Sequence, residues 1–285
     1  MKKSFLVLCV FTILSQNAFA DSVILMIGDG MGKNHIDCVK KDNNLFLHNL
    51  SPISNIKTSS ANSHITDSAA AATSYACGIK TNNGYLGIDT EQNVCITIAE
   101  QAVSWKKNVY IISTDNDTGA TPSAFYSHVN DRNNTYKILN HKSKNEQYMH
   151  IKLNAHSLEN ETKDLLSKLE NETKEFFVMI EAAHIDKASH DNNYNLMKEA
   201  LVDFDKSISL IYDFVKERKN IHLFITADHE TGGLTSECKY TTTTHTSDDV
   251  HLYAKTPSLI PMRDIENFEL YYIMKELLQK DINNN

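Results

Sequence analysis

Four short apolar runs stand out along the chain, and each of them predicts a buried β-strand. The runs cover residues 23–27, 109–112, 176–180 and 221–225. They are rich in β-branched and aromatic residues and do not alternate with polar ones, as is typical of strands buried on both faces. Helical patterns lie between and after these runs, over 67–75, 196–215 and 269–278. Strands that alternate with helices predict an α/β fold, a three-layer α/β/α sandwich with a mainly parallel central sheet.

The longest helical pattern carries apolar residues at helical spacing, namely Leu196, Ala200, Phe204, Ile208, Ile211 and Val215. In contrast, residues 133–164 are polar and weakly patterned, and we expect a surface insertion there. With 285 residues, 41% of them hydrophobic and 22% charged, the chain has the composition of a globular protein. Its 28 basic and 36 acidic residues give a net charge of −8, which disfavours a nucleic-acid partner.

The first twenty residues have the pattern of a secretory signal peptide. Lys2 and Lys3 precede an apolar stretch over 5–14, and residues 18–20 form an A-x-A cleavage site. The stretch is too short for a membrane anchor, which needs about 20 apolar residues. We therefore expect residues 1–20 to be removed, residues 21–285 to form one domain, and the protein to be periplasmic or secreted.

Four cysteines follow this segment, at positions 38, 77, 95 and 238. Export permits disulfides, and four cysteines allow three pairings. Cys77 and Cys95 are the nearest pair along the chain, and we take their pairing as an expectation. There is no C-x-x-C spacing, which disfavours a cysteine zinc site.

Acidic and imidazole side chains follow the predicted strands at the points where the strands end. Asp29 follows the first run, Glu181 the third, and Asp228 with His229 the fourth. Ligands of open α/β sheets bind beyond the carboxyl ends of the strands. Carboxylates gathered at one edge repel one another unless cations neutralise them. A metal site at this edge accounts for the clustering better than chance does.

Each local motif also has an ordinary structural interpretation. Asp186 and His190 are four residues apart and would share one face of a helical turn, as zinc ligands or as surface residues. Ser68 begins an alanine-rich helix, where phosphate can bind the helix N-terminus but an N-cap is the commoner reason for such a residue. His245 lies in a polar loop, where most histidines are only solvated. The glycine-rich turn at 28–32 does not fit a P-loop, and no G-x-S-x-G elbow is present.

Taken together and in order, these motifs resemble the alkaline phosphatase family. The matching segments are the Asp29–Gly32 turn, 66–73, 78–81, Thr121-Pro122 with Arg132, Glu181 with Asp186 and His190, 226–229, and His245-Thr246. The resemblance extends from about Asp21 to Ala254.

The resemblance implies a role for each matched residue. One zinc ion is bound by Asp186, His190 and His245, and a second by Asp29, Asp228 and His229. A third ion, normally Mg²⁺, is bound by Asp29, Thr121 and Glu181. Ser68 is the nucleophile that forms a phosphoserine, and Arg132 binds the phosphoryl oxygens. Lys187, next to Asp186, can contact water or phosphate and so partly compensate for the glycine at position 119.

Three features depart from the pattern of the family. Gly119 stands two residues before Thr121, where members commonly carry Asp or His, so the outer shell of the third ion differs. Long segments of the larger members are missing between Arg132 and Glu181, and between His229 and His245. We therefore expect a compact member with an open site, either monomeric or homodimeric.

The function expected from the resemblance is hydrolysis of small phosphate monoesters. A phosphodiesterase on the same scaffold is the alternative enzyme, although Arg132 favours a monoester because it needs free phosphoryl oxygens. A phosphate- or metal-binding protein without turnover is the alternative from another class.

Overall fold

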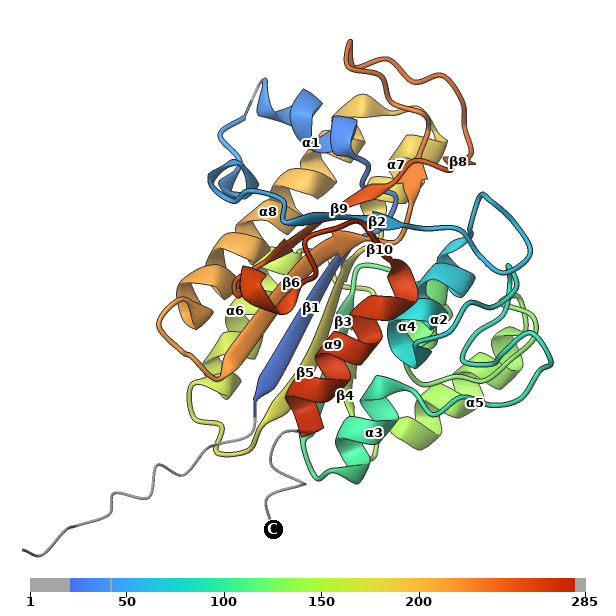
Figure 1. Cartoon of the computed structure of the whole chain (residues 1–285), viewed down its shortest axis with the longest axis vertical. Coiled ribbons are helices and arrows are strands. Elements are labelled where there is room, and N and C mark those ends of the chain that lie inside the picture. The colour runs from blue at the N-terminus through green and yellow to red at the C-terminus, as the bar shows by residue number, and fades with distance from the viewer. Residues whose placement is uncertain (1–20, 42, 280–285) are drawn as a thin grey trace, which may run out of the picture.

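The computed structural model describes residues 21–41 and 43–279, and its centre is an eight-stranded sheet (Figure 1). The strand order is β10-β2-β9-β6-β1-β5-β3-β4, and β7 pairs separately with β8. The strands are β1 (Ser22–Gly28), β2 (Ser54–Lys57), β3 (Asn108–Ser113), β4 (His150–Lys152), β5 (Phe176–Ala182), β6 (Ile221–Ala227), β7 (Glu230–Thr231), β8 (His245–Thr246), β9 (Val250–Ala254) and β10 (Ile265–Glu266). In the eight-stranded sheet, β9 alone runs against its two neighbours, β6 and β2. The predicted mainly parallel sheet is thus confirmed.

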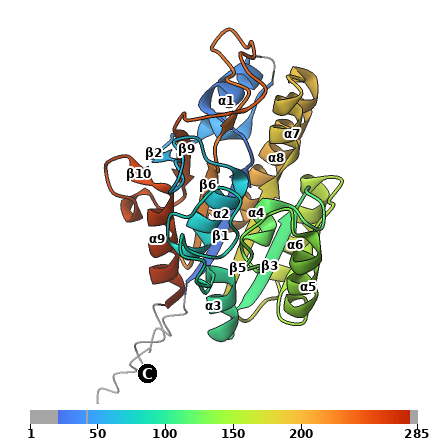
Figure 2. The same cartoon turned by 90° about the vertical axis from the view of Figure 1, so that its right-hand side faces the viewer.

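Helices cover both faces of this sheet. They are α1 (Lys33–Lys40), α2 (Ser68–Cys77), α3 (Ile98–Ser104), α4 (Ala120–Ser123), α5 (Thr135–Asn145), α6 (Leu158–Leu169), α7 (His184–His190), α8 (Tyr194–Val215) and α9 (Asn267–Gln279), with short 3-10 turns at Phe46–Asn49 and Pro257–Leu259. Helix α8 packs on β6, β1 and β5, and α6 packs against α8. On the other face, α9, α3 and α4 contact the strands, and α2 lies against α9 and α4 (Figures 1 and 2). This arrangement is the expected α/β/α sandwich.

The four predicted strands form the middle of the sheet. They are β6, β1, β5 and β3, which are neighbours in that order. Every residue of β1, β5 and β6 is buried, because helices cover both faces of these strands. Gly28 pairs with Ala182 on one side and with Ala227 on the other, so the three strands end at the same level. The residues that follow these ends therefore meet at one edge.

The predicted surface insertion over 133–164 is wrong in part. Residues 150–152 form β4, which pairs with β3 and extends the sheet, and α6 packs against α8. The sequence signal is weak because β4 has three residues and its outer side chains are exposed.

The buried face of α8 also differs from the predicted one in the first turns of the helix. Leu196 is half exposed, and Met197 and Leu201 are buried in its place. Met197 and Leu201 continue the spacing of three and four residues set by Phe204 and Ile208, so they complete the buried face.

Two disulfides link the four cysteines that follow residue 20. Cys77 pairs with Cys95, as predicted, and Cys38 pairs with Cys238. The second bond fastens α1 to the loop between β7 and β8. The predicted signal peptide, residues 1–20, lies outside the described residues. None of the helices in the described part of the chain is long and apolar enough to cross a membrane.

Candidate active site

Three neighbouring strands deliver the predicted ligands to one edge of the sheet. Asp29 follows β1, Asp228 and His229 follow β6, and Glu181 lies near the end of β5. Asp29 and Asp228 are almost fully buried, as are Glu181 and His229. Buried ionisable groups are costly unless they are paired or bind a cation. The burial of these groups therefore favours a cation-binding site at this edge over a chance collection of charges.

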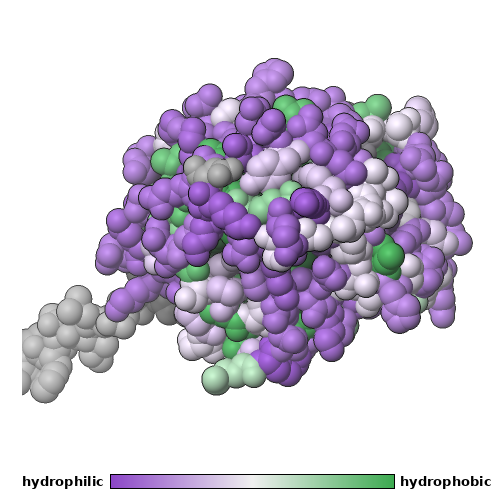
Figure 3. Space-filling view, turned by 90° about the horizontal axis from the view of Figure 1, so that it is seen from above, coloured by the Kyte–Doolittle hydropathy of each residue, from purple (hydrophilic) through white to green (hydrophobic). Residues whose placement is uncertain are grey.

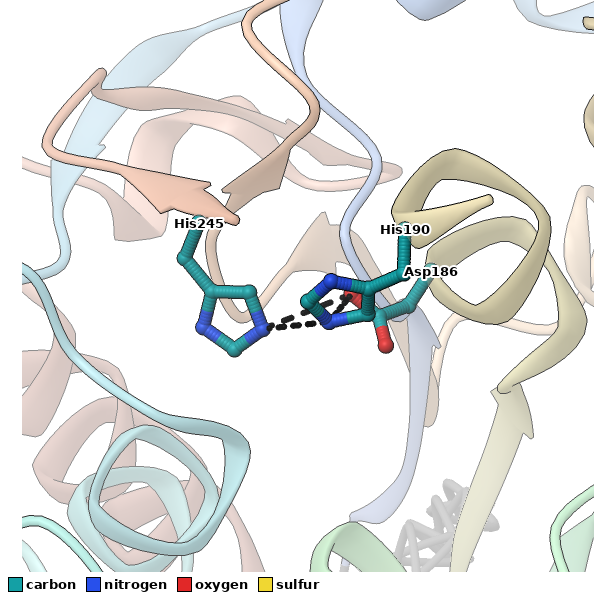
Figure 4. Close-up of side chains that lie close together, drawn as sticks. All are labelled: Asp186, His190 and His245. Atoms are coloured by element: carbon teal, nitrogen blue, oxygen red, sulfur yellow. Dashed lines mark hydrogen bonds and ion pairs between the residues drawn. The ribbon is translucent and has the colours of Figure 1, made fainter. Parts of the chain in front are cut away.

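The first ligand group consists of Asp186, His190 and His245. The helical turn of α7 places Asp186 and His190 on one face, and His245 comes from β8. Figure 4 shows the three side chains converging. The Nε2 atoms of the two histidines are 3.1 Å apart, and they lie 3.3 and 3.5 Å from Oδ1 of Asp186. One oxygen and two imidazole nitrogens form a donor set suited to zinc.

Backbone carbonyls fix both imidazoles of the first group with Nε2 facing inward. His190 donates from Nδ1 to the carbonyl oxygen of Thr243 at 2.6 Å, and His245 donates from Nδ1 to that of Thr66 at 2.9 Å. A carbonyl can only accept, so Nδ1 carries the proton and Nε2 is left to bind an ion. The hydrogen bond to Asp186 raises the pKa of His190 to about 9, although burial opposes it. The carboxylate of Asp186 thus favours the positively charged form of His190.

The second ligand group consists of Asp29, Asp228 and His229. Nε2 of His229 lies 3.1 Å from Oδ2 of Asp228 and 3.6 Å from Oδ1 of Asp29. These two carboxylate oxygens are buried and have no hydrogen-bond partner. Burial raises the pKa of Asp29 well above its usual value, and the nearby carboxylates, Asp228 first, add to the effect. A divalent cation would satisfy both orphaned oxygens and remove this repulsion.

Thr231 joins the two groups, a role that no sequence motif indicated. Its hydroxyl donates to Oδ1 of Asp186 at 2.5 Å and lies 3.2 Å from Nδ1 of His229. Since the hydroxyl proton is used on Asp186, Nδ1 of His229 must donate to the Thr231 oxygen. The ring of His229 therefore also has its Nε2 available for an ion.

Ser68 is the first residue of α2 and points at the second group. Its Oγ lies 3.2 Å from Nε2 of His229. Asp67, and not Ser68, caps the helix by accepting from the N–H of Ala70. All residues of α2 are buried, and its run of alanines lets it pack closely against α9 and α4. The serine is thus held by a rigid, enclosed helix.

Arg132 lies beside the serine through a contact with Asp67. Its Nη1 donates to Oδ2 of Asp67 at 3.0 Å, and this oxygen also accepts from the N–H of Gly84. About a third of the arginine side chain is exposed. One carboxylate therefore positions both the start of α2 and the guanidinium, with part of the guanidinium still accessible.

The third ligand group expected from the sequence consists of Asp29, Thr121 and Glu181. Oγ1 of Thr121 and Oε1 of Glu181 are buried without a hydrogen-bond partner, like Oδ1 of Asp29. Oε2 of Glu181 accepts from the hydroxyl of Ser113. Burial, and next the charge of Asp115, raise the pKa of Glu181 to about 8. Three orphaned oxygens suit a hard cation such as Mg²⁺.

Lys187 does not stand alone beside this group but forms an ion pair with Asp115. Asp115 lies two residues after the end of β3 and belongs to none of the ligand groups predicted from the sequence. The end of the molecule at which α1, α7 and β8 lie is shown in Figure 3. It is mostly hydrophilic, with small separated hydrophobic patches.

Comparisons with known proteins identify the family of the chain. The family model described as alkaline phosphatase matches residues 20–157 and 144–242. The chain belongs to the alkaline phosphatase family. Alkaline phosphatase 4 of Bacillus subtilis is 26% identical over 286 residues, and alkaline phosphatase 3 of the same organism is 27% identical over 283. These alignments cover 75% and 74% of this chain but only 62% and 61% of the two relatives, so the chain spans about three fifths of their length.

Solved alkaline phosphatases share the fold. The enzyme from the Antarctic bacterium TAB5 superposes with a TM-score of 0.79 at 23% identity, over 92% of this chain and 98% of that one. The cold-active enzyme from Shewanella sp. gives 0.79 at 19% identity, over 90% and 99%. The fold of these two solved structures is therefore shared over at least nine tenths of this chain.

Proposed function

We propose that this protein is an exported, metal-dependent phosphomonoesterase in which Ser68 attacks phosphorus. The observation that carries the proposal is the position of Ser68 Oγ, 3.2 Å from Nε2 of His229 in the second ligand group. A serine hydroxyl is a weak nucleophile unless a base or a metal activates it. Ser68 has a ligand group beside it that could do so.

The ions we propose are two zinc ions and one magnesium ion. The first and second ligand groups each offer nitrogen and carboxylate oxygen, which suits zinc, and the third offers only oxygen. A variant of the TAB5 alkaline phosphatase carries magnesium in a site called M3. When bound, a pair of such ions lowers the pKa of a hydroxyl and stabilises the attacking and leaving oxygens.

The residues of this chain orient the ester and receive the phosphoryl group. Arg132, held by Asp67, offers a planar pair of N–H donors to two phosphoryl oxygens. The ester oxygen that leaves would lie on the side of His190 and His245, opposite the serine. The bond from Ser68 Oγ to phosphorus forms as the bond to the leaving alcohol breaks, and water then hydrolyses the phosphoserine. The substrates are small phosphate monoesters, since they keep the free oxygens that Arg132 needs.

Hydrolysis of p-nitrophenyl phosphate by the full chain and by Ser68→Ala tests the proposal, with metals counted by mass spectrometry. We expect about two zinc ions per chain in both proteins, and turnover in the wild type alone. Bis(p-nitrophenyl) phosphate serves as the diester control. Faster hydrolysis of the diester would favour the phosphodiesterase, and bound zinc without turnover would favour a binding protein.

A further inference from the structure

The carboxylate of Asp115 occupies the place that a side chain at position 119 would need. A Cβ atom added to Gly119 would lie 2.4 Å from Oδ2 and 2.5 Å from Cγ of Asp115. The backbone of Gly119 has φ −52° and ψ 134°, which any residue can adopt. Glycine is therefore required here by the space that Asp115 fills, and not by backbone conformation. The carboxylate of Asp115 and a side chain at position 119 therefore cannot both occupy this space.

Asp115 is held in place from three directions. Its Oδ1 accepts from the ammonium of Lys187 and from the N–H of Asn116 at 2.8 Å, while Oδ2 faces Gly119. Its own N–H donates to the hydroxyl of Ser113 at 2.7 Å. That hydroxyl in turn donates to Oε2 of Glu181. The backbone of Asp115 is thus linked through one hydroxyl to Glu181 of the third ligand group.

The third ligand group contains buried oxygen atoms that a cation would satisfy. Thr121, Glu181 and Asp29 each have one buried oxygen atom without a hydrogen-bond partner. Asp115 adds a further carboxylate to the same neighbourhood, since its charge acts on both Glu181 and Asp29. Lys187 offsets one negative charge only, and its side chain is half exposed.

We propose that Asp115 belongs to the shell around the cation of the third ligand group, in place of the absent side chain at position 119. The carboxylate comes from the end of β3 instead of from the residue that caps α4, and Lys187 orients it. This inference rests on the proposed function, because it concerns the third ion of the same site. The cation is Mg²⁺, which is usually held by few carboxylates and keeps part of its water shell.

Calorimetric titration of the zinc-loaded full chain with Mg²⁺ tests this proposal. Asp115→Asn keeps the size of the side chain but removes its charge, and we expect the Kd for Mg²⁺ to rise roughly tenfold to a hundredfold. Zinc content and the thermal melting curve should stay as in the wild type. Asp117→Asn is the matched control, because Asp117 lies two residues away and pairs with Lys142 at a half-exposed surface position. This control should leave the Kd for Mg²⁺ unchanged.

A second pair of variants tests directly whether position 119 can supply the carboxylate in place of position 115. Gly119→Ala should weaken Mg²⁺ binding as Asp115→Asn does, since the new methyl group displaces the carboxylate. The double variant Asp115→Ala with Gly119→Asp should recover most of the affinity, because the carboxylate returns from the other position. The Asp115→Asn protein could instead bind Mg²⁺ within twofold of the wild-type affinity while keeping two zinc ions and phosphatase turnover. That result would overturn the role of Asp115 but leave the proposed function standing. A wild-type protein that bound neither zinc nor Mg²⁺ would overturn both.

Discussion

The imidazole rings of His229 and His245 stack with their centroids 3.6 Å apart. Each ring belongs to a different ligand group, and each directs Nε2 toward its own group. The stacking brings the two groups as close as paired metal ions require, about 3.5–4 Å in enzymes that transfer phosphoryl groups. His190 also faces His245, with ring centroids 4.9 Å apart. Substitution of His190 should thus affect the ion of the first group alone, whereas substitution of His245, which stacks on His229, should affect both ions.

His190→Ala is expected to remove one zinc ion per chain and leave the ion of the second ligand group in place. The variant keeps only Asp186 and His245 in the first group, which is too few for a stable zinc site. Metal counting by mass spectrometry checks this, with His150→Ala as the control because His150 lies exposed on β4. A count equal to that of the wild type would remove His190 from the ligands.

Thr231→Val should lower kcat roughly tenfold to a hundredfold, the range found for residues that orient metal ligands. Valine keeps the shape of threonine but lacks the hydroxyl that contacts both Asp186 and His229. Thr231→Ser restores the hydroxyl and should recover activity. The Kd for zinc, measured by competition with a chelator, should rise in the valine variant only; equal affinity in both variants would contradict the role.

Arg132→Ala should weaken inhibition by inorganic phosphate by about tenfold to a hundredfold, since a hydrogen bond to a charged group contributes about 1.5–3 kcal/mol. We expect KM to rise and zinc content to stay constant, because Arg132 contacts Asp67 and no ligand. Arg263→Ala is the control, since Arg263 is exposed and pairs with Glu269. An unchanged inhibition constant would place the phosphate elsewhere.

Loss of the Cys38–Cys238 bond should weaken zinc binding as well as stability. The bond spans 200 residues, and a loop of this length corresponds to about 5 kcal/mol in the chain-entropy description. It also fastens the loop whose Thr243 carbonyl orients His190 and whose end carries His245. Urea unfolding and chelator competition on a Cys38→Ser/Cys238→Ser protein measure the two effects.

The other disulfide provides the matched control for that experiment. Cys77–Cys95 spans 18 residues, for which the same description gives about 3 kcal/mol. A Cys77→Ser/Cys95→Ser protein should lose stability but keep its zinc affinity, because the bond lies at the far end of α2 from Ser68. Equal losses of zinc affinity in both proteins would show that the Cys38–Cys238 bond has no special effect on the ligands.

Stability should depend on pH through the pair of His128 and Glu100, whose Nε2 and Oε1 atoms are 2.9 Å apart. Burial opposes both charges, but their mutual hydrogen bond raises the pKa of His128 and lowers the pKa of Glu100. The contribution of His128 to stability is complete below pH 6.5, its usual pKa, and is lost as the pH rises through the raised pKa. The contribution of Glu100 to stability is present above pH 4.5, its usual pKa, and is lost as the pH falls through the lowered pKa. His128→Gln should therefore be most destabilising near pH 5–6 and progressively less so above 6.5, by urea unfolding; a constant difference would contradict this.

The central strands and the ligands that follow them could be predicted because the relevant signals are local. An unbroken apolar run indicates a strand buried on both faces, and the residue after it, such as Asp29 or Asp228, must lie at the edge of the sheet. The outer strands β2, β4, β9 and β10 were missed. They have five residues or fewer, and β2 carries one fully buried residue, so their patterns are weak.

The parts of the site that escaped prediction depend on tertiary contacts. Thr231 is an unremarkable residue in sequence, and only the fold brings it between Asp186 and His229. The place of Asp115 against Gly119 likewise follows from the turn between β3 and α4. His245 was found through its family motif, since a histidine in a polar loop has no distinguishing pattern of its own.

Each ligand group draws its members from distant parts of the chain. Asp29 lies at the end of the first strand, yet it needs Asp228 and His229, and Asp186 needs His245. A growing polypeptide cannot assemble either group until almost all of the described chain has left the ribosome. An ion bound by the second group would then link the end of β1 to the residues that follow β6. Capture of either ion would come late in folding, and a product truncated before Asp228 would lack members of both groups.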